Sequence, residues 1–209
     1  MIARSNSTCA LVSGGLDSAL LVHRLLVRGH CVLPLYLRCG LRWERAELSW
    51  LRRYLDAIRT PALAPLLVVE MPLADVYRGH WSVSGRRIPG ARSADAAVYL
   101  PGRNALLVTH AAIVCARRRI SSIALGILNG NPFGDASPRF FAQMASCLTQ
   151  ALRHPIRITA PLRALTKQRL IPAFLYRHTA WGRPHRRHGR RVGARRTCCT
   201  GRSGAARAD

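Results

Sequence analysis

The stretch Cys9-Ala10-Leu11-Val12-Ser13-Gly14-Gly15-Leu16-Asp17-Ser18 decides the fold of this 209-residue chain. Its first four residues form a short apolar run, which is typical of a buried strand. The glycines that follow permit a tight turn and a close approach of the backbone to a bound group. Residues 18–28 then repeat apolar side chains at helical spacing, and Gly29 is a natural stop for a helix. The stretch therefore predicts a strand, a sharp loop and a helix, in that order.

The alternation continues along the chain. Apolar runs predict strands at residues 31–37 and 66–70, with an amphipathic helix at residues 43–58 whose polar positions include Glu44 and Glu47. Alternating strands and helices are the pattern of a parallel sheet with crossover helices. We therefore expect an α/β fold: an open, mostly parallel, Rossmann-like sheet with helices on both faces.

The second half of the chain predicts further elements and one long irregular segment. Helices are expected at residues 103–117 and 137–152, the latter with Ser137 as its N-cap and Pro138 at its first position. Strands are expected at residues 122–128 and 156–159, and another helix from Thr166. Residues 72–98 have no regular pattern, so we interpret them as a lid or binding loop.

The length fits one domain, which we place at residues 1–175. Residues 176–209 hold ten arginines, a single acid and little apolar periodicity, so we expect a disordered or divergent tail. The chain has no apolar stretch of the ~18 residues that a membrane span needs, and its first residues do not resemble a signal peptide. We therefore expect a cytoplasmic protein without a membrane partner.

The charge is strongly basic. The chain has 33 basic and 9 acidic residues, a formal net charge of +24. Nucleic acid is the first partner that such a charge suggests. However, all the basic residues but Lys167 are arginine, which GC-rich coding explains more simply than selection for phosphate contacts. Nucleic-acid binding therefore remains possible but less favoured.

Residues 13–18, between the expected strand and helix, have the chemistry of a phosphate-binding loop. A helix start offers unpaired N–H groups and the positive end of the helix dipole. Ser13 and Ser18 add hydroxyl donors, while Asp17 either holds a Mg²⁺ ion or caps the helix. The loop lacks the Gly-Lys-Ser/Thr of the Walker type. The alternative interpretation is an ordinary strand-to-helix turn.

Two motifs resemble a known family. The segment Ser13–Ser18 has the SGGxDS signature of the ATP-pyrophosphatase, or PP-loop, superfamily, and Pro101-Gly102-Arg103-Asn104 resembles the PGRN motif of the 7-cyano-7-deazaguanine synthase family. Residues 40–47, 131–141 and 160–167 resemble further segments of that family. The resemblance implies an adenine nucleotide alpha hydrolase-like fold and a C–N ligase of queuosine biosynthesis.

The implied reaction converts 7-carboxy-7-deazaguanine and ammonia to 7-cyano-7-deazaguanine, with ATP and Mg²⁺, through adenylated intermediates. The resemblance also implies association into a homodimer. The nucleotide-binding residues expected from the motifs are Val12, Ser13, Gly14, Gly15, Leu16, Asp17, Ser18 and Asn104. The expected catalytic residues are Asp17, Arg103 and Lys167.

Interpretations without a functional role remain for the residues outside the loop. We assign Asp135 to the substrate, although a Gly-Asp pair is also common in plain turns. The segment holding Arg103 and Asn104 also fits a turn followed by a polar helix start. Lys167 is the sole lysine, and its compact ammonium suits phosphate contacts; the alternative is a lysine that survived by chance.

One feature departs from the family, which has a zinc cluster of four cysteines near its end. The expected spacing is absent here, with no CxxC pair, so we assign no metal ligands and expect mostly buried free thiols. One hypothesis is that the chain runs out of frame, or otherwise diverges, after about Leu170; sequencing the end of the gene tests it. The cysteines are Cys9, Cys31, Cys39, Cys115, Cys147, Cys198 and Cys199.

Two other functions stay open at this point. One is another PP-loop enzyme, such as a tRNA-thiolating enzyme or an amide ligase, and the strong positive charge is its best argument. The other is a nucleic-acid-binding module that uses the arginine-rich residues 182–209.

Overall fold

The computed structural model of the protein describes residues 6–90, 92–166 and 168. Its centre is a five-stranded sheet with the order β3-β2-β1-β4-β5, and every pairing is parallel. The expected open, parallel sheet is therefore confirmed. The strands are β1 (Ser7–Leu11), β2 (Cys31–Arg38), β3 (Leu67–Glu70), β4 (Ser122–Leu125) and β5 (Arg157–Thr159).

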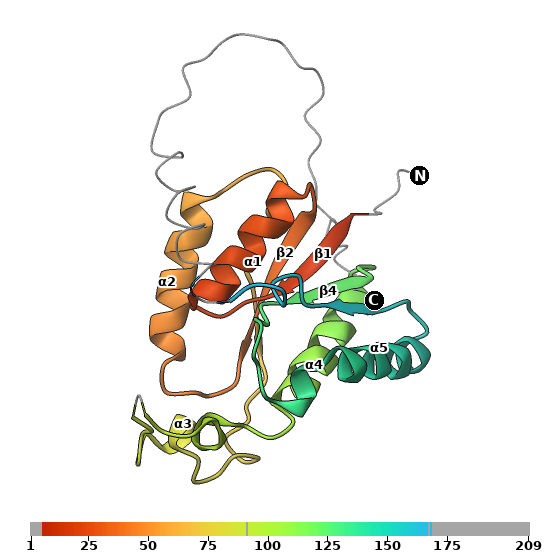
Figure 1. Cartoon of the computed structure of the whole chain (residues 1–209). Helices are drawn as coiled ribbons and strands as arrows, with labels where there is room; N and C mark the ends of the chain where they lie inside the picture. Colours follow the sequence, from red (N-terminus) through yellow and green to blue (C-terminus); the bar gives the residue numbers. More distant parts are fainter. Residues whose placement is uncertain (1–5, 91, 167, 169–209) are drawn as a thin grey trace, which may run out of the picture.

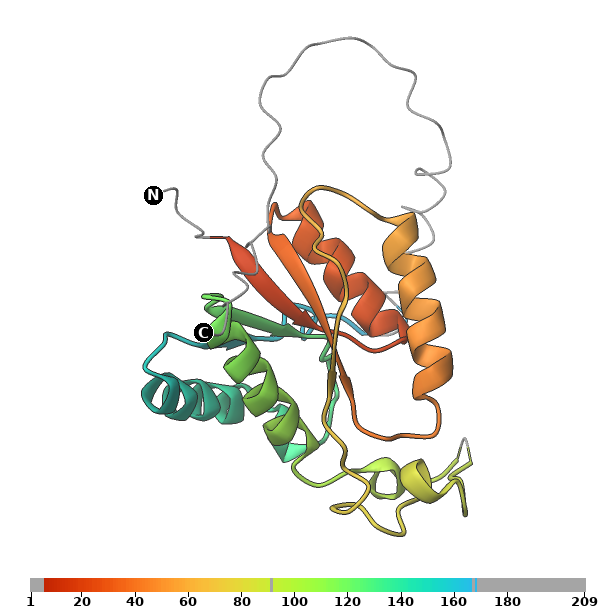
Figure 2. The same cartoon turned by 180° about the vertical axis from the view of Figure 1, so that it is seen from behind.

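Helices cover both faces of the sheet, as expected. Figure 1 shows α1 (Leu16–Val27) and α2 (Glu44–Ala57) side by side on one face, and α4 (Arg103–Arg117) and α5 (Pro138–Leu152) on the other. The view from behind in Figure 2 shows the same two layers. The sheet is thus enclosed between an α1–α2 layer and an α4–α5 layer.

Alternating side chains of the strands supply two separate cores. In β1, Cys9 packs into the cluster of the α4–α5 layer, and its neighbour Ala10 packs into the cluster of the α1–α2 layer. In β4, Ile123 and Ala124 divide in the same way. Because both faces are covered, the strands carry almost continuous apolar runs rather than a polar face.

Most expected elements agree with the structure. Helix α5 has the expected start: the Ser137 side chain accepts a hydrogen bond from Phe140 N at 3.2 Å, and Pro138 is its first residue. Strand β4 ends at Leu125, three residues earlier than expected. The expected helix after Thr166 falls almost entirely outside the described residues.

Two expectations need correction. Residues 72–98 are not wholly irregular, since they contain α3 (Trp81–Ser84) and the 3₁₀ turn η1 (Asp95–Val98). Four-residue helices are too short to show a periodic pattern. In addition, Glu44 does not lie on an exposed polar face of α2 but is only 5% exposed.

The strand order reverses at β1, and this reversal positions the site. The chain moves from β1 to β2 and β3 on one side, and later to β4 and β5 on the other. In open α/β sheets, ligands bind in the crevice at the carboxyl ends of the strands where the order reverses. The loop after β1 and the loop after β4 meet there: a Cβ added to Gly126 would lie 3.1 Å from the Asp17 carbonyl oxygen.

Within the described residues, no helix has the length and apolar character to cross a membrane.

Candidate functional site

The 13–18 loop is held by its two serines. Ser13 N donates to Ser18 Oγ at 2.8 Å, the two hydroxyls lie 3.1 Å apart, and Gly15 N donates to Ser13 Oγ at 3.3 Å. Gly15 is the N-cap of α1 in an extended conformation and offers no side-chain acceptor to the first turn. The loop is therefore a backbone-lined helix start, the local geometry that suits an anion.

Gly14 is required by its contact with α2. A Cβ on this residue would lie 2.4 Å from Glu47 Cα and 2.6 Å from the Glu47 carbonyl oxygen. Both are backbone atoms, which cannot rotate away as a flexible side chain would. Gly15 has no such restriction, since its added Cβ would meet only Ser13 Oγ, at 3.4 Å. The loop thus rests directly on the backbone of α2.

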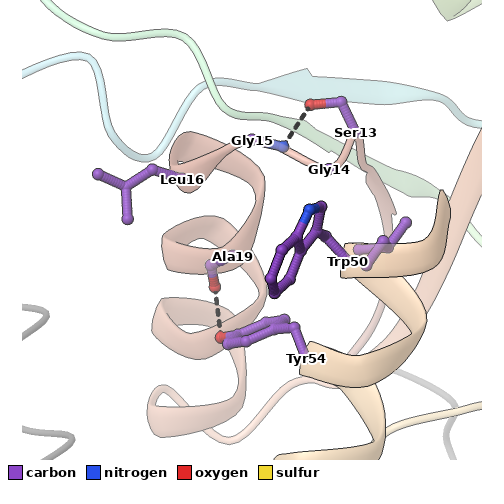
Figure 3. A pocket seen from close by; sticks show the side chains of 8 residues that line it. Ser13, Gly14, Gly15, Leu16, Ala19, Trp50 and Tyr54 are labelled. Carbon is purple, nitrogen blue, oxygen red and sulfur yellow. Dashed lines mark hydrogen bonds between the residues drawn. The ribbon is translucent and has the colours of Figure 1, made fainter. Parts of the chain in front are cut away.

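A pocket of 210 Å³ lies beside the loop, in the groove between α1 and α2 (Figure 3). The Trp50 indole lies over it, and the Tyr54 hydroxyl donates to the Ala19 carbonyl oxygen at 2.7 Å. Burial raises the pKa of Tyr54. The lining residues are Ser13, Gly14, Gly15, Leu16, Ala19, Trp50, Leu51 and Tyr54.

Arg103 brings a positive charge to the same edge of the sheet. It is the first residue of α4, directly after Gly102, which takes a left-handed φ of 70°. Its Nε is buried and, within the described part of the chain, has no hydrogen-bond partner. Leaving such a donor unpaired costs about 1–3 kcal/mol. An arginine N–H held in this way is suited to an oxygen of a bound phosphate or carboxylate.

Glu47 is a half-buried carboxylate between the loop and Arg103. It accepts a hydrogen bond from the Tyr36 hydroxyl at 2.9 Å. Burial raises the pKa of Glu47 above the ordinary 4.5. The hydrogen bond from Tyr36 and the positive charge of Arg103 lower the pKa, but their effect is smaller than that of burial. Burial also raises the pKa of the Cys39 thiol to about 11, while Arg103 opposes that rise. Cys39 is therefore a protonated thiol near neutral pH, which is a poor nucleophile.

Asp135 fixes the start of α4. Its Oδ2 accepts from Asn104 N at 3.0 Å, and its Oδ1 accepts from Asn104 Nδ2 at 3.3 Å. Asp135 is 9% exposed and lies in the 3₁₀ turn η2 (Gly134–Ala136), which follows β4. A carboxylate near a helix N-terminus is stabilised by the helix dipole. The structure thus gives Asp135 a positioning role, and its expected contact with substrate stays a prediction.

Residues 72–98 are anchored to the PGRN segment and to α2. The Tyr77 hydroxyl donates to the Pro101 carbonyl oxygen at 2.7 Å, and within the segment Trp81 Nε1 donates to the Ala97 carbonyl oxygen at 2.8 Å. The Trp81 ring lies 5.2 Å from that of Trp43, just before α2. The segment therefore lies at the carboxyl edge of the sheet, where a lid would be expected.

The residues that the sequence predicted form two groups at the carboxyl edge of the sheet. The 13–18 loop follows Val12, whose N–H donates to the Leu35 carbonyl oxygen at 2.9 Å, while Arg103, Asn104 and Asp135 surround the start of α4. Lys167 lies outside the described residues, as do Cys198, Cys199 and the whole expected tail.

The described part of the chain contains no group of three or more His, Cys, Asp or Glu residues able to hold a metal ion. Cys9, Cys39 and Cys115 are buried free thiols, as expected. Cys147 is also a free thiol, but it is exposed, which differs from the expected burial.

Sequence reasoning missed Glu47, Glu44 and Cys39. Glu44 accepts a short hydrogen bond from Cys39 N, and it holds the turn that leads from β2 into α2. All three side chains belong to a segment that was interpreted as a strand end and an amphipathic helix. One signal in the sequence pointed to the two glutamates. The chain has only nine acidic residues against 33 basic ones, so each carboxylate is a candidate for a specific role.

Comparison with known proteins identifies a family and similar proteins. The model of the family described as "Queuosine biosynthesis protein QueC" matches residues 7–176. The chain is 28% identical over 169 residues to 7-cyano-7-deazaguanine synthase 1 of Desulfitobacterium hafniense (strain Y51), covering 79% of this chain and 74% of that protein. It is 26% identical over 178 residues to 7-cyano-7-deazaguanine synthase of Picrophilus torridus, covering 77% and 70%.

A solved structure supports the fold alone. A predicted subunit of tRNA methyltransferase from Methanocaldococcus jannaschii superposes with a TM-score of 0.51 at 16% identity, covering 84% of this chain and 74% of that one. The family match spans β1 through β5, and includes both the 13–18 loop and the PGRN segment. This chain belongs to the queuosine biosynthesis protein QueC family.

Proposed function

We propose that the chain is an ATP-dependent synthase that converts 7-carboxy-7-deazaguanine and ammonia to 7-cyano-7-deazaguanine. The observation that carries the proposal is the family match over residues 7–176, which contains an anion-suited loop and an arginine whose Nε is buried and unpaired at one edge of the sheet. The names of the two similar synthases supply the substrate class.

The proposed chemistry has two activations. A carboxylate oxygen of the substrate attacks the α-phosphorus of ATP, and pyrophosphate leaves. Ammonia then attacks the carbonyl carbon and displaces AMP, which gives an amide. The amide oxygen attacks a second ATP in the same way, and loss of AMP and a proton leaves the nitrile. Each activation replaces a poor oxygen leaving group with AMP.

The residues of the chain would divide this work. Backbone N–H groups at the start of α1 and the hydroxyls of Ser13 and Ser18 would bind the departing pyrophosphate. The Arg103 guanidinium would donate to a phosphate or carboxylate oxygen and so satisfy its buried Nε. Asn104 would place this arginine, since its N–H and side chain are held by Asp135.

The proposal includes a magnesium ion at the loop, which Asp17 would hold. Asp17 lies in the first turn of α1, half-buried, and its Cβ approaches Gly126 after β4. Carboxylate oxygen is the ligand that Mg²⁺ prefers, usually with waters and substrate phosphates completing the shell. When bound, the ion would neutralise charge that develops on the phosphates. Asp17 is the residue of the loop that would hold it.

A direct assay tests the proposal. The full chain is incubated with ATP, Mg²⁺, ammonium and 7-carboxy-7-deazaguanine, and AMP and the nitrile are measured by mass spectrometry. We expect both products, and Asp17→Ala should abolish AMP release while leaving the circular dichroism spectrum unchanged. AMP release that depends on added tRNA, with no nitrile, would instead assign the chain to the tRNA-modifying PP-loop enzymes.

A further inference from the structure

The edge of the sheet opposite the candidate site carries a cluster of arginines, which we name the basic edge. Here α4 and α5 end, and β4 and β5 begin. All five arginines are exposed, and no ion pair joins any of them to a carboxylate within the described residues. They are Arg117, Arg118, Arg119, Arg153 and Arg157.

Backbone contacts hold these arginines in one region. Arg157 N donates to the Ser121 carbonyl oxygen at 2.8 Å, and Arg157 pairs with Ser122 in the sheet. His154 Nε2 lies 3.0 Å from the Ile120 carbonyl oxygen. The end of α5 and the start of β5 are therefore attached to residues 120–122, which directly follow the three arginines at the end of α4.

The cluster is not explained by codon usage alone. GC-rich coding replaces lysine with arginine, but it does not remove acids from one layer and leave them in the other. Helices α1 and α2 contain Asp17, Glu44, Glu47 and Asp56, whereas α4, α5, β4 and β5 contain no acidic residue at all. The positive potential of the basic edge therefore has no nearby carboxylate on its own elements to reduce it.

Helix stabilisation does not explain the cluster either. Helix α1 ends with Gly29 at φ 78°, followed by a His30 N to Leu25 O bond of 3.1 Å. Helix α4 ends in the same way, with an Ile120 N to Cys115 O bond of 2.9 Å, but the left-handed residue is Arg119, at φ 57°. Glycine is favoured at this position because it has no Cβ. Basic residues do favour a helix C-terminus, but they need not occupy the left-handed position.

Arg153 repeats this exception at the end of α5, where its φ is 48°. Two helices that end on the basic edge thus keep an arginine where glycine would be more stable. A strained backbone conformation that is retained in this way points to a use for the side chain. Arginine's planar fork binds phosphate oxygens in pairs.

We propose that the basic edge binds the phosphate backbone of a nucleic acid. An extended polyanion matches exposed arginines that lie at the ends of α4 and α5 and at the start of β5, and no shaped pocket is needed for backbone contacts. The proposal goes beyond the synthase activity and does not depend on it, because the basic edge lies across the sheet from the 13–18 loop.

The test compares two matched triple variants of the full chain. One neutralises the basic edge (Arg117→Gln, Arg118→Gln, Arg157→Gln), and the other neutralises three exposed arginines of α2 (Arg45→Gln, Arg52→Gln, Arg53→Gln). Binding to a fluorescein-labelled 20-nucleotide single-stranded RNA is measured by anisotropy at several salt concentrations. Both variants lose the same formal charge, so non-specific attraction falls equally in the two.

We expect the basic-edge variant to bind about tenfold more weakly than the α2 variant, and its salt slope to fall by about 0.7 for each phosphate contact removed. Equal losses in the two variants would show that net charge alone attracts the RNA and would overturn the proposal. Binding to vesicles of anionic phospholipid without binding to RNA would overturn it in favour of a membrane surface.

A second variant separates binding from folding. Changing Arg119 and Arg153 to glycine should raise Tm by about 2–4 °C per site, because glycine relieves the left-handed strain, and should still weaken RNA binding. An unchanged affinity in this more stable protein would contradict the proposal.

Discussion

The two helical layers serve the candidate site in different ways. The α1–α2 layer contributes backbone: the 13–18 loop has no room for a Cβ at Gly14, and it rests on the main chain of α2. The α4–α5 layer contributes side chains: Arg103 supplies charge, and Asp135 holds Asn104. In the α1–α2 layer, adding even one carbon atom to the loop should therefore disturb the site. In the α4–α5 layer, replacing one polar side chain by another should disturb it.

The largest expected effect lies in the backbone layer. Gly14→Ala places a Cβ against fixed atoms of Glu47, so we expect the free energy of unfolding to fall by about 3 kcal/mol. Gly15→Ala is the matched control, with an expected loss within about 1 kcal/mol. Urea unfolding measures both. Equal losses would show that the loop does not depend on contact with α2.

The next effect concerns the charge that the other layer supplies. Arg103→Lys keeps a positive charge but loses the fork, and we expect the rate of AMP release to fall by about 100-fold. Arg139→Lys, on the exposed first turn of α5, should leave the rate unchanged. If Arg103→Lys keeps the full rate, a point charge is sufficient, and the unpaired Nε has no part in binding.

A smaller effect tests the positioning role of Asp135. Asp135→Asn places an amide NH₂ against a donor of Asn104, and we expect a loss of about 1–3 kcal/mol in the free energy of unfolding. The control is Asp75→Asn, which removes an exposed ion pair with Arg78 and should change it by less than about 0.5 kcal/mol. Similar values for the two would mean that Asp135 does not hold α4.

The smallest effect is a pH dependence in the backbone layer. Because the folded protein raises the pKa of Glu47 above 4.5, it binds more protons there than the unfolded chain, and Glu47's contribution to stability decreases as pH rises through this range. Glu47→Gln removes this titration but keeps an acceptor for Tyr36. We therefore expect the stability of wild type relative to Glu47→Gln to decrease as pH rises from about 4.5. Chemical unfolding at several pH values measures this difference, and a constant difference would contradict it.

The sequence predicted the helices and strands well, but it did not predict which strands are neighbours or which distant residues are in contact. Within the described residues, apolar runs and helical spacing placed every strand and the four long helices, because these patterns reflect burial on two faces. Strand β4 was predicted too long because Gly126 and its neighbours continue the apolar pattern, although the chain leaves the sheet there to approach Asp17. The strand order was not predicted, since apolar patterns do not specify which strands are neighbours.

The same distinction holds for the candidate site, where contiguous motifs were predicted and contacts between distant residues were not. The 13–18 loop and the PGRN segment are contiguous in sequence, so local chemistry identified them. Glu47 was placed on a polar helix face, because only the fold brings it against Gly14 and Tyr36. The pairing of Asp135 with Asn104 joins residues that are 31 positions apart, and no local pattern indicates it.

The central position of β1 has a consequence for the synthesis of the chain. Its partners are β2, which begins at Cys31, and β4, which begins only at Ser122. A ribosome therefore releases β1, β2 and β3 long before β4, and one edge of β1 has no strand to pair with until then. Unpaired strand edges promote aggregation of nascent chains. The order of translation thus leaves the seam between β1 and β4, where the candidate site lies, open until well after the first three strands have been made.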